Sequence, residues 1–180
     1  NDMQGIPFRR RLKEKGISIG IKVDTGKNKI GTSYITNGIQ DLDNRLKGYS
    51  DADFAKWRAV FQITDSTPDI ENIRTNCELL AQYAKICQEH EIVPIVEPEI
   101  LRDGNFDIQT NYEVAKQVMY HLFEKLDEYK VEIRYVVLKP SMVTAGSRKE
   151  VSTIDETDRM TSLLFEETLP AELPIVAFLS

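Results

Sequence analysis

Short apolar runs alternate along this chain with longer segments in which apolar residues recur every three or four positions. The short runs have the length and the β-branched composition of strands. They cover residues 20–24, 54–60, 95–100, 136–140 and 174–179. The longer segments have the spacing of amphipathic helices and cover about 40–48, 69–89, 111–129 and 155–168. Alternation of strand and helix predicts right-handed crossovers and a parallel sheet.

Four of the five predicted strands contain ionisable residues, which a soluble core normally excludes. They include Lys22, Lys56, Arg58, Glu97, Glu99 and Lys139. Burying such groups is costly unless they pair with one another or take part in chemistry. Lysines that face glutamates across a shared interior would form a reaction centre. We therefore take these six residues as the candidate site.

An open doubly wound sheet and a closed (β/α)8 barrel both fit this order of elements. No glycine-rich phosphate loop follows any predicted strand. The charged residues lie in or at the ends of several different strands, as they do in barrel enzymes. At about 40 residues per unit, eight units need more than the 180 residues of this chain. We therefore predict that residues 1–180 are the central part of one (β/α)8 barrel domain, with about five βα units present and flanking units missing at both ends.

Charge and cysteine content exclude several classes of function. The formal net charge is −6 and the isoelectric point is about 5.1, so nothing favours a nucleic acid partner. The basic run Arg9–Arg11 fits a solvated face or a helix start. No stretch approaches the ~20 apolar residues of a membrane span, and no signal peptide opens the chain. Cys77 and Cys87 lie ten residues apart in one predicted helix, too far apart to bridge. We expect a reducing, cytoplasmic setting and no membrane partner.

Lys139 is the strongest candidate for a nucleophile. It ends the apolar run 135–138 and is followed by Pro140, which stops strand pairing. A lysine in an apolar wall, near other cations, is more easily held as the neutral amine, which attacks a carbonyl to form a Schiff base. Nearby carboxylates would move the protons that this reaction needs. The chemistry alone leaves a second interpretation open, a lysine whose side chain reaches solvent from the end of a strand.

Three motifs resemble the signature strands of class I fructose-bisphosphate aldolase. They are Phe54-Ala55-Lys56-Trp57-Arg58-Ala59-Val60, Ile92-Val93-Pro94-Ile95-Val96-Glu97-Pro98-Glu99-Ile100 and Leu138-Lys139-Pro140-Ser141-Met142-Val143-Thr144. Shorter matches at 20–24, 36–38 and 80–84 extend the resemblance over nearly the whole chain. The chain departs from the family at Arg134-Tyr135, where Glu-Gly is usual, and at Ser141, where asparagine is common. The resemblance implies a (β/α)8 barrel and a chain about half the family length.

The resemblance also implies a reaction and a role for each candidate residue. The reaction is metal-independent cleavage of fructose 1,6-bisphosphate to dihydroxyacetone phosphate and glyceraldehyde 3-phosphate, a step of glycolysis and gluconeogenesis. Lys139 would form the Schiff base, Glu97 would shuttle protons, and Glu99 would orient the network. Lys56 would stabilise developing charge, while Lys22 and Arg58 would hold the sugar phosphate. No cofactor and no metal are implied, and the family suggests a homotetramer.

Two alternatives stay open beside this reading. The first is a Schiff-base aldolase for a related sugar phosphate, against which the retention of Lys22, Lys56 and Arg58 weighs. The second is a non-catalytic scaffold with an aldolase-like surface, which the presence of Lys139, Glu97 and Lys56 disfavours. His90 and His121 lie in predicted helices, away from the charged strands, and we do not expect them to be ligands. The expected core is Ile21, Val23, Trp57, Val60, Ile95, Val96, Val137, Leu138, Val176 and Phe178.

Overall fold

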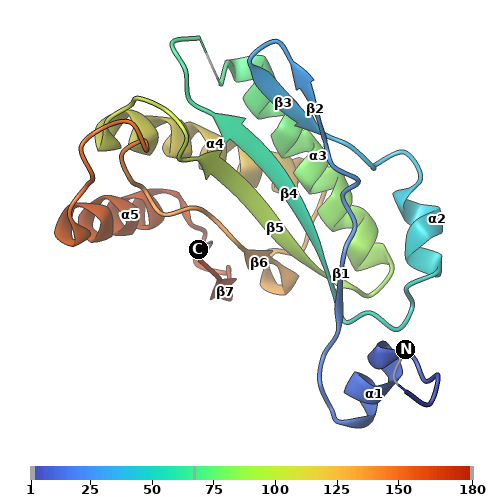
Figure 1. Cartoon of the computed structure of the whole chain (residues 1–180). Coiled ribbons are helices and arrows are strands. Elements are labelled where there is room, and N and C mark those ends of the chain that lie inside the picture. The colour runs from blue at the N-terminus through green and yellow to red at the C-terminus, as the bar shows by residue number, and fades with distance from the viewer. Residues whose placement is uncertain (1–2, 67, 179–180) are drawn as a thin grey trace.

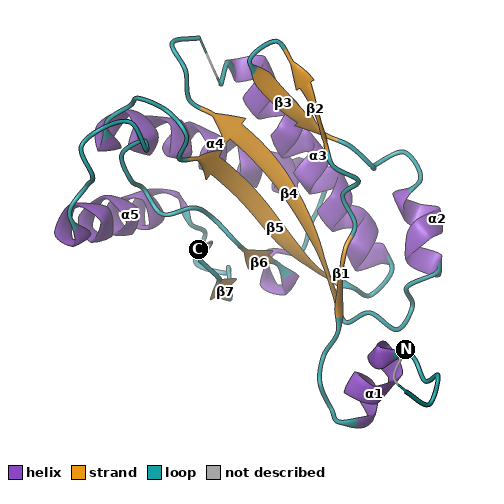
Figure 2. Ribbon diagram, viewed as in Figure 1, coloured by secondary structure: helices purple, strands orange, loops and turns teal. Residues whose placement is uncertain are grey.

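A parallel sheet of five strands forms the centre of the computed structural model, which describes residues 3–66 and 68–178 (Figure 1, Figure 2). The strands are β1 (Gly20–Lys22), β4 (Phe54–Gln62), β5 (Val93–Leu101), β6 (Val137–Leu138) and β7 (Ile175–Val176). They pair in chain order, and every pair is parallel. A doubly wound sheet would reverse its strand order at one point, so the uninterrupted order favours consecutive units of a barrel.

Helices lie between the strands, as the periodicity predicted. They are α2 (Leu42–Lys47), α3 (Ile70–Glu89), α4 (Ile108–Glu128) and α5 (Ile154–Thr168). Figure 1 shows α3 and α4 behind the sheet, where both contact its strands. All four predicted helices are confirmed, with ends displaced by up to three residues. None of the helices in the described ranges is long and apolar enough to span a membrane.

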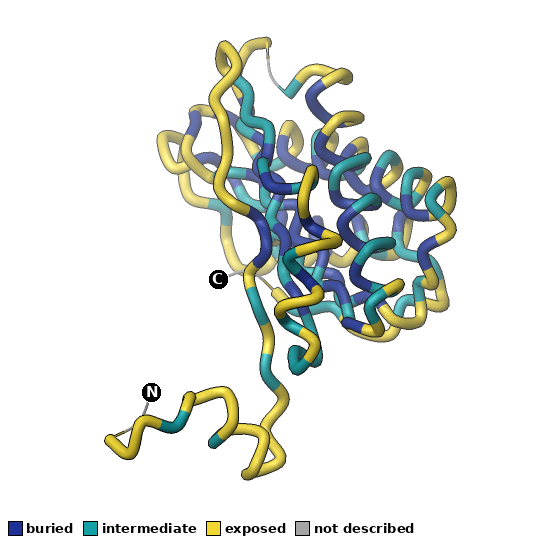
Figure 3. Tube along the Cα trace, turned by 90° about the vertical axis from the view of Figure 1, so that its right-hand side faces the viewer, coloured by how far each residue is buried: buried dark blue, intermediate teal, exposed yellow. Residues whose placement is uncertain are grey.

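The sequence predicted a solvated face or a helix start at the basic run, and it predicted neither a hairpin nor a 3-10 turn. A first helix, α1 (Phe8–Glu14), contains the basic run and is mostly exposed beyond the sheet-and-helix body (Figure 3). A hairpin of β2 (Lys27–Ile30) and β3 (Ser33–Thr36) turns at Gly31, whose φ is +61°. A 3-10 turn, η1, covers Ile133–Tyr135. The hairpin escaped prediction because every residue of β2 is exposed, so β2 has no buried apolar face to reveal it.

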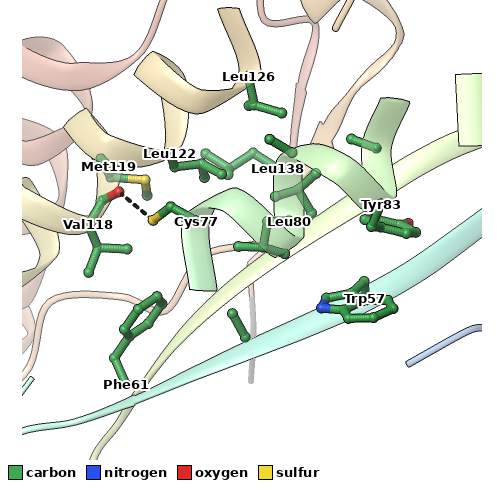
Figure 4. Packing of buried hydrophobic residues seen from close by; sticks show 14 of the residues in the cluster. Trp57, Phe61, Cys77, Leu80, Tyr83, Val118, Met119, Leu122, Leu126 and Leu138 are labelled. Carbon is green, nitrogen blue, oxygen red and sulfur yellow. Dashed lines mark hydrogen bonds between the residues drawn. The ribbon is translucent and has the colours of Figure 1, made fainter. Parts of the chain in front are cut away.

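The main core lies between the sheet and the two long helices (Figure 4). Trp57 and Phe61 point from β4 towards α3, and the Trp57 ring stacks on that of Tyr83 with 5.6 Å between centroids. From the helices come Cys77, Leu80, Tyr83, Val118, Met119, Leu122 and Leu126. Full burial of an aromatic or leucine side chain stabilises the fold by about 1.5–3 kcal/mol. Packing of these side chains therefore holds the sheet against α3 and α4.

The predicted core is confirmed in part. Val23, Trp57, Val60, Val96 and Leu138 are buried, whereas Ile21, Ile95, Val137 and Val176 are half-buried. Burial of Phe178 is wrong: its ring stacks on Phe165, but 51% of the residue stays exposed. Phe178 follows the edge strand β7, which ends at Val176, three residues earlier than predicted. Residue 179, also assigned to that strand, lies outside the described residues.

Both cysteines are buried and free. The Cys77 thiol donates a weak hydrogen bond to the carbonyl of Val118 at 3.6 Å (Figure 4). Burial raises the pKa of the Cys87 thiol to about 12. The thiolate is the nucleophilic form of cysteine. Cys87 is therefore a poor nucleophile.

Replacing Asp107 with alanine is expected to destabilise the natural protein that contains this chain by about 1 kcal/mol near neutral pH. Asp107 is the N-cap of α4, and one carboxylate oxygen accepts bonds from the backbone N–H and the hydroxyl of Thr110, both at 2.8 Å. The backbone bond from Thr110 is the main cause that lowers the pKa of Asp107. The measurement is the urea midpoint, with Asp107→Asn as the control that keeps the cap.

The Asp107 effect has a defined pH dependence. A carboxyl whose pKa is lowered on folding stabilises the protein above its unfolded pKa of about 3.9, and that contribution is lost as the pH falls through the folded value. The gap between the wild-type and alanine proteins should therefore shrink in acid. An alanine variant as stable as wild type near neutral pH would contradict the capping role.

Candidate active site

The six candidate residues lie on the face of the sheet that turns away from α3 and α4. Residues opposite one another in a parallel sheet share a face, and so do residues two apart in one strand. The register places Lys22 opposite Lys56, Arg58 opposite Glu97, and Val60 opposite Glu99. Val137 lies opposite Ile95, so Lys139, two residues later, joins the same face. Trp57 and Val96 occupy the other face, against the helices.

Glu97 joins two lysines from neighbouring strands. Its Oε1 lies 2.7 Å from Lys139 Nζ, and its Oε2 lies 2.6 Å from Lys56 Nζ. The Glu97 side chain is 1% exposed, while those of Lys56 and Lys139 are 24% and 30% exposed. A carboxylate buried to this degree is tolerated when charged partners use its oxygens. The contact explains why an acidic residue stands within an apolar strand.

A second ion pair lies further along the same two strands. Arg58 Nη1 is 2.8 Å from Glu99 Oε2, with side chains 40% and 16% exposed. Arg58 and Lys56 lie two residues apart in β4, as Glu99 and Glu97 do in β5. The two pairs therefore form adjacent rungs on one face, and the guanidinium keeps part of its surface open to solvent.

Lys22 pairs with Asp24, a residue that sequence reasoning did not include in the site. Lys22 Nζ lies 2.5 Å from Asp24 Oδ1 and 3.0 Å from the Asp24 carbonyl. The same carboxylate accepts from the backbone N–H groups of Gly26 and Arg58 at 3.3 and 3.4 Å. Asp24 thus ties β1 to β4. Its position two residues after Lys22 was the available signal, because it places both side chains on one face.

The structure brings the six predicted residues together unequally. Lys56, Glu97 and Lys139 are in direct contact, Arg58 and Glu99 form the adjacent rung, and Lys22 belongs to a separate pair. A polar cavity of about 580 Å³ lies nearby, at the carboxyl ends of β4 and β5. None of the six residues lines that cavity. The candidate site is therefore defined by the charged cluster on the sheet, with its lysines and arginine partly open to solvent.

His121 lies on α4 and His90 is the C-cap residue that follows α3, and each contacts a carboxylate. His90 Nε2 is 2.9 Å from Asp43 Oδ1, and His121 Nδ1 is 3.1 Å from Glu124 Oε2. Within residues 3–66 and 68–178, no group of three or more histidine, cysteine or acidic side chains could hold a metal ion. The six candidate residues themselves supply amines, carboxylates and a guanidinium.

The arrangement suits proton transfer next to an amine nucleophile. An amine must lose its proton before it can attack a carbonyl, and Glu97 lies within hydrogen-bond distance of both Lys56 and Lys139. The lysine that does not attack stays beside the reacting atoms as a fixed positive charge, which stabilises negative charge as it develops.

The chain is similar to curated proteins along almost its whole length. A family sequence model described as "Fructose-bisphosphate aldolase class-I" matches residues 1–180. Fructose-bisphosphate aldolase of Drosophila melanogaster is 41% identical over 98% of this chain and 50% of its own length. The probable class 1 enzyme of Xylella fastidiosa is 42% identical over 98% of this chain and 54% of its own length. Human fructose-bisphosphate aldolase C is 40% identical over 99% of this chain and 51% of its own length. The chain therefore spans about half the length of these relatives.

A solved structure gives the same result for the fold. Fructose-bisphosphate aldolase from Plasmodium falciparum, crystallised with TRAP and a small-molecule inhibitor, matches with a TM-score of 0.93 at 36% identity. The match covers 99% of this chain and 54% of that chain. The predicted fold class, a (β/α)8 barrel of which part is present, is confirmed.

Proposed function

Because this chain belongs to the class I fructose-bisphosphate aldolase family, we propose that the protein containing it cleaves fructose 1,6-bisphosphate through a Schiff base on Lys139. The observation that carries this proposal is the contact of the buried Glu97 carboxylate with both Lys139 and Lys56. Since the chain spans about half the length of its relatives, we further propose that residues 1–180 are the central part of one barrel domain.

Formation of the Schiff base begins when Glu97 accepts a proton from Lys139. The neutral amine attacks C2 of the ketone, and a proton of the attacking nitrogen passes to the resulting alkoxide to give a carbinolamine. The proton on Glu97 then passes to the C2 hydroxyl, which leaves as water as the protonated imine forms. Glu97 ends this sequence as a carboxylate, so it acts as base and then as acid within one step.

Cleavage uses the protonated imine as an electron sink. Glu97 removes the proton of the C4 hydroxyl, the C3–C4 bond breaks, and its electron pair moves into the imine to give an enamine. Glyceraldehyde 3-phosphate leaves as the aldehyde. Protonation at C3 and hydrolysis of the imine then release dihydroxyacetone phosphate and restore the Lys139 amine. Every proton that is removed is returned within the cycle, and the cycle consumes no oxidant or reductant.

The remaining charged groups bind and stabilise. Lys56, whose ammonium lies at the same carboxylate as Lys139, stabilises negative charge that develops near the cleaved bond. Arg58 and Lys22 hold the sugar phosphate, since their side chains are 40% and 51% exposed and can exchange a carboxylate partner for a phosphate. Glu99 orients Arg58 through the adjacent rung.

Borohydride reduction of the natural protein with dihydroxyacetone phosphate tests the proposal. The expected result is one reduced adduct, mapped by peptide mass spectrometry to Lys139, with the same yield in EDTA because the imine needs no metal. An adduct on Lys56 would reverse the roles of the two lysines. An intact protein without any adduct would favour the non-catalytic scaffold. Loss of activity in EDTA that zinc restores would point to metal-dependent chemistry instead.

A further inference from the structure

Ser141 lies where pairing between β5 and β6 stops, two residues after Lys139. The last ladder bond runs from the Lys139 N–H to the Val96 carbonyl at 2.8 Å. Alternate residues of a strand direct their backbone groups to the same neighbour, so Val96, Pro98 and Ile100 face the segment after β6. Pro98 and Pro140 have no N–H, and the regular ladder cannot continue through them.

The Ser141 side chain replaces the missing ladder. Its hydroxyl accepts a hydrogen bond from the Ile100 N–H at 3.1 Å and lies 3.4 Å from the Ile100 carbonyl, to which it donates. One hydroxyl thus satisfies both backbone groups of the residue that follows Glu99. A side chain without a donor and an acceptor would leave this N–H and this carbonyl without their Ser141 partner.

Contacts to the β5 backbone are made at Lys139 and again after it, on either side of the contact between Lys139 and Glu97. The backbone bond from Lys139 to Val96 ties the chain to β5 at Lys139, whose side chain contacts Glu97. The bonds between Ser141 and Ile100 tie it to β5 again two residues later. On the β7 side, the Leu138 carbonyl accepts from the Ala177 N–H at 2.8 Å. Without the Ser141 hydroxyl, the chain would keep its bond to β5 at Lys139 and would lose its bonds to β5 at residue 141.

Side chains continue to hold the segment beyond Ser141. The Val143 N–H donates to Thr161 Oγ1 at 3.0 Å, Asn111 Nδ2 donates to the Thr144 carbonyl at 2.7 Å, and the Ala145 N–H donates to Ser152 Oγ at 2.9 Å. Side chains therefore hold this segment, which belongs to neither a helix nor a strand. Among these side-chain contacts, the one at Ser141 is nearest to Lys139 in the chain and is made with β5, the strand that carries Glu97.

We infer that Ser141 is a positioning residue, which keeps the Lys139 amine at the Glu97 carboxylate by tying the chain after Lys139 to Ile100. This inference rests on the proposed function, because it concerns the rate at which Lys139 forms its imine. Ser141 acts through the backbone, so its loss should slow the covalent step and leave the binding of substrate phosphate by Lys22 and Arg58 in place.

The test measures the rate of borohydride-trapped imine formation with dihydroxyacetone phosphate, together with kcat and KM, in the natural protein. Ser141→Ala is expected to lower the trapping rate and kcat roughly 5- to 20-fold, the worth of about one or two hydrogen bonds, with KM within about twofold. Ser141→Thr keeps the hydroxyl and should restore the rate to within about threefold. If the alanine variant does not fold, Ser141→Cys has a similar shape and a much weaker donor and acceptor, and the same slowing is expected.

Ser152→Ala is the matched control. It removes a serine hydroxyl that accepts a hydrogen bond from the Ala145 N–H. Ala145 lies in the same segment as Ser141 but farther along the chain from Lys139. Its melting temperature should fall about as much as that of Ser141→Ala, while its trapping rate should equal that of wild type. Equal slowing in both variants, or none in Ser141→Ala, would overturn the role of Ser141 and leave the proposed function standing. A wild-type protein that forms no adduct would overturn the proposed function itself.

Discussion

Replacing Lys139 with methionine is expected to abolish aldol cleavage and the borohydride adduct while the protein stays folded. Methionine has a similar length but no amine, so no covalent intermediate can form, and kcat should fall by roughly 10⁴-fold or more. The fold should survive because Lys56 remains 2.6 Å from Glu97 and continues to neutralise that buried carboxylate. Steady-state cleavage of fructose 1,6-bisphosphate and circular dichroism together check this prediction.

Lys22→Met provides a matched control for Lys139→Met. The chemical change is the same, but Lys22 pairs with Asp24 and lies apart from the cluster at Glu97. This variant should raise KM for the sugar phosphate and still form the adduct on Lys139. Turnover that persists in Lys139→Met would rule out the Schiff-base mechanism proposed for this lysine.

Replacing Glu97 with glutamine is expected to slow imine formation by about 10²- to 10⁴-fold, the usual contribution of a general acid and base. The amide has nearly the same shape but cannot take a proton from Lys139 or return it to the leaving hydroxyl. It also leaves Lys56 and Lys139 side by side without a negative charge between them, so some loss of stability should accompany the loss of rate. Single-turnover trapping with dihydroxyacetone phosphate isolates the covalent step.

Glu99→Gln separates proton transfer from electrostatic support. Glu99 lies on the same face of β5 and contacts Arg58 at 2.8 Å, as Glu97 contacts its lysines. We expect a smaller fall in rate, accompanied by a higher KM, since Arg58 would lose its orienting partner. Equal losses of trapping rate in the two variants would show that removal of a nearby charge, rather than removal of the proton carrier, explains the effect.

The alternation of apolar strands and amphipathic helices was sufficient to predict the order of the main elements. Ionisable residues within those strands also predicted where the site would lie. The order of the elements is confirmed, and Lys56, Glu97 and Lys139 are in contact, because both follow from local patterns: burial sets the period of each element, and a charge in an apolar run is costly wherever the strand pairs. Lys56, Glu97 and Lys139 were therefore recognisable as one group before their contact was seen.

The register of the strands and the surroundings of individual residues could not be predicted from such local patterns. Which glutamate meets which lysine depends on how β4, β5 and β6 align, and a shift by two residues would have placed Glu99 beside Lys56 without changing the sequence pattern. Asp24 was not included in the site because, as the last residue of the predicted strand 20–24, it does not interrupt an apolar run. Phe178 was assigned to the core from its apolar strand pattern, but strand pairing gives β7 a neighbour on one side only within the described residues.

In the proposed reaction, Glu97 would be an ionised counter-ion both before the imine forms and after it has formed. With all three groups ionised, Lys56, Glu97 and Lys139 together carry one positive charge, and conversion of the Lys139 ammonium to a protonated imine leaves that total unchanged. The carboxylate that lies beside the resting nitrogen is thus already in place to balance the covalent intermediate. Because the field at this point of the sheet is the same before and after bond formation, little reorganisation of the surrounding dipoles is required, and the covalent step can proceed in a frame of strands that does not have to move.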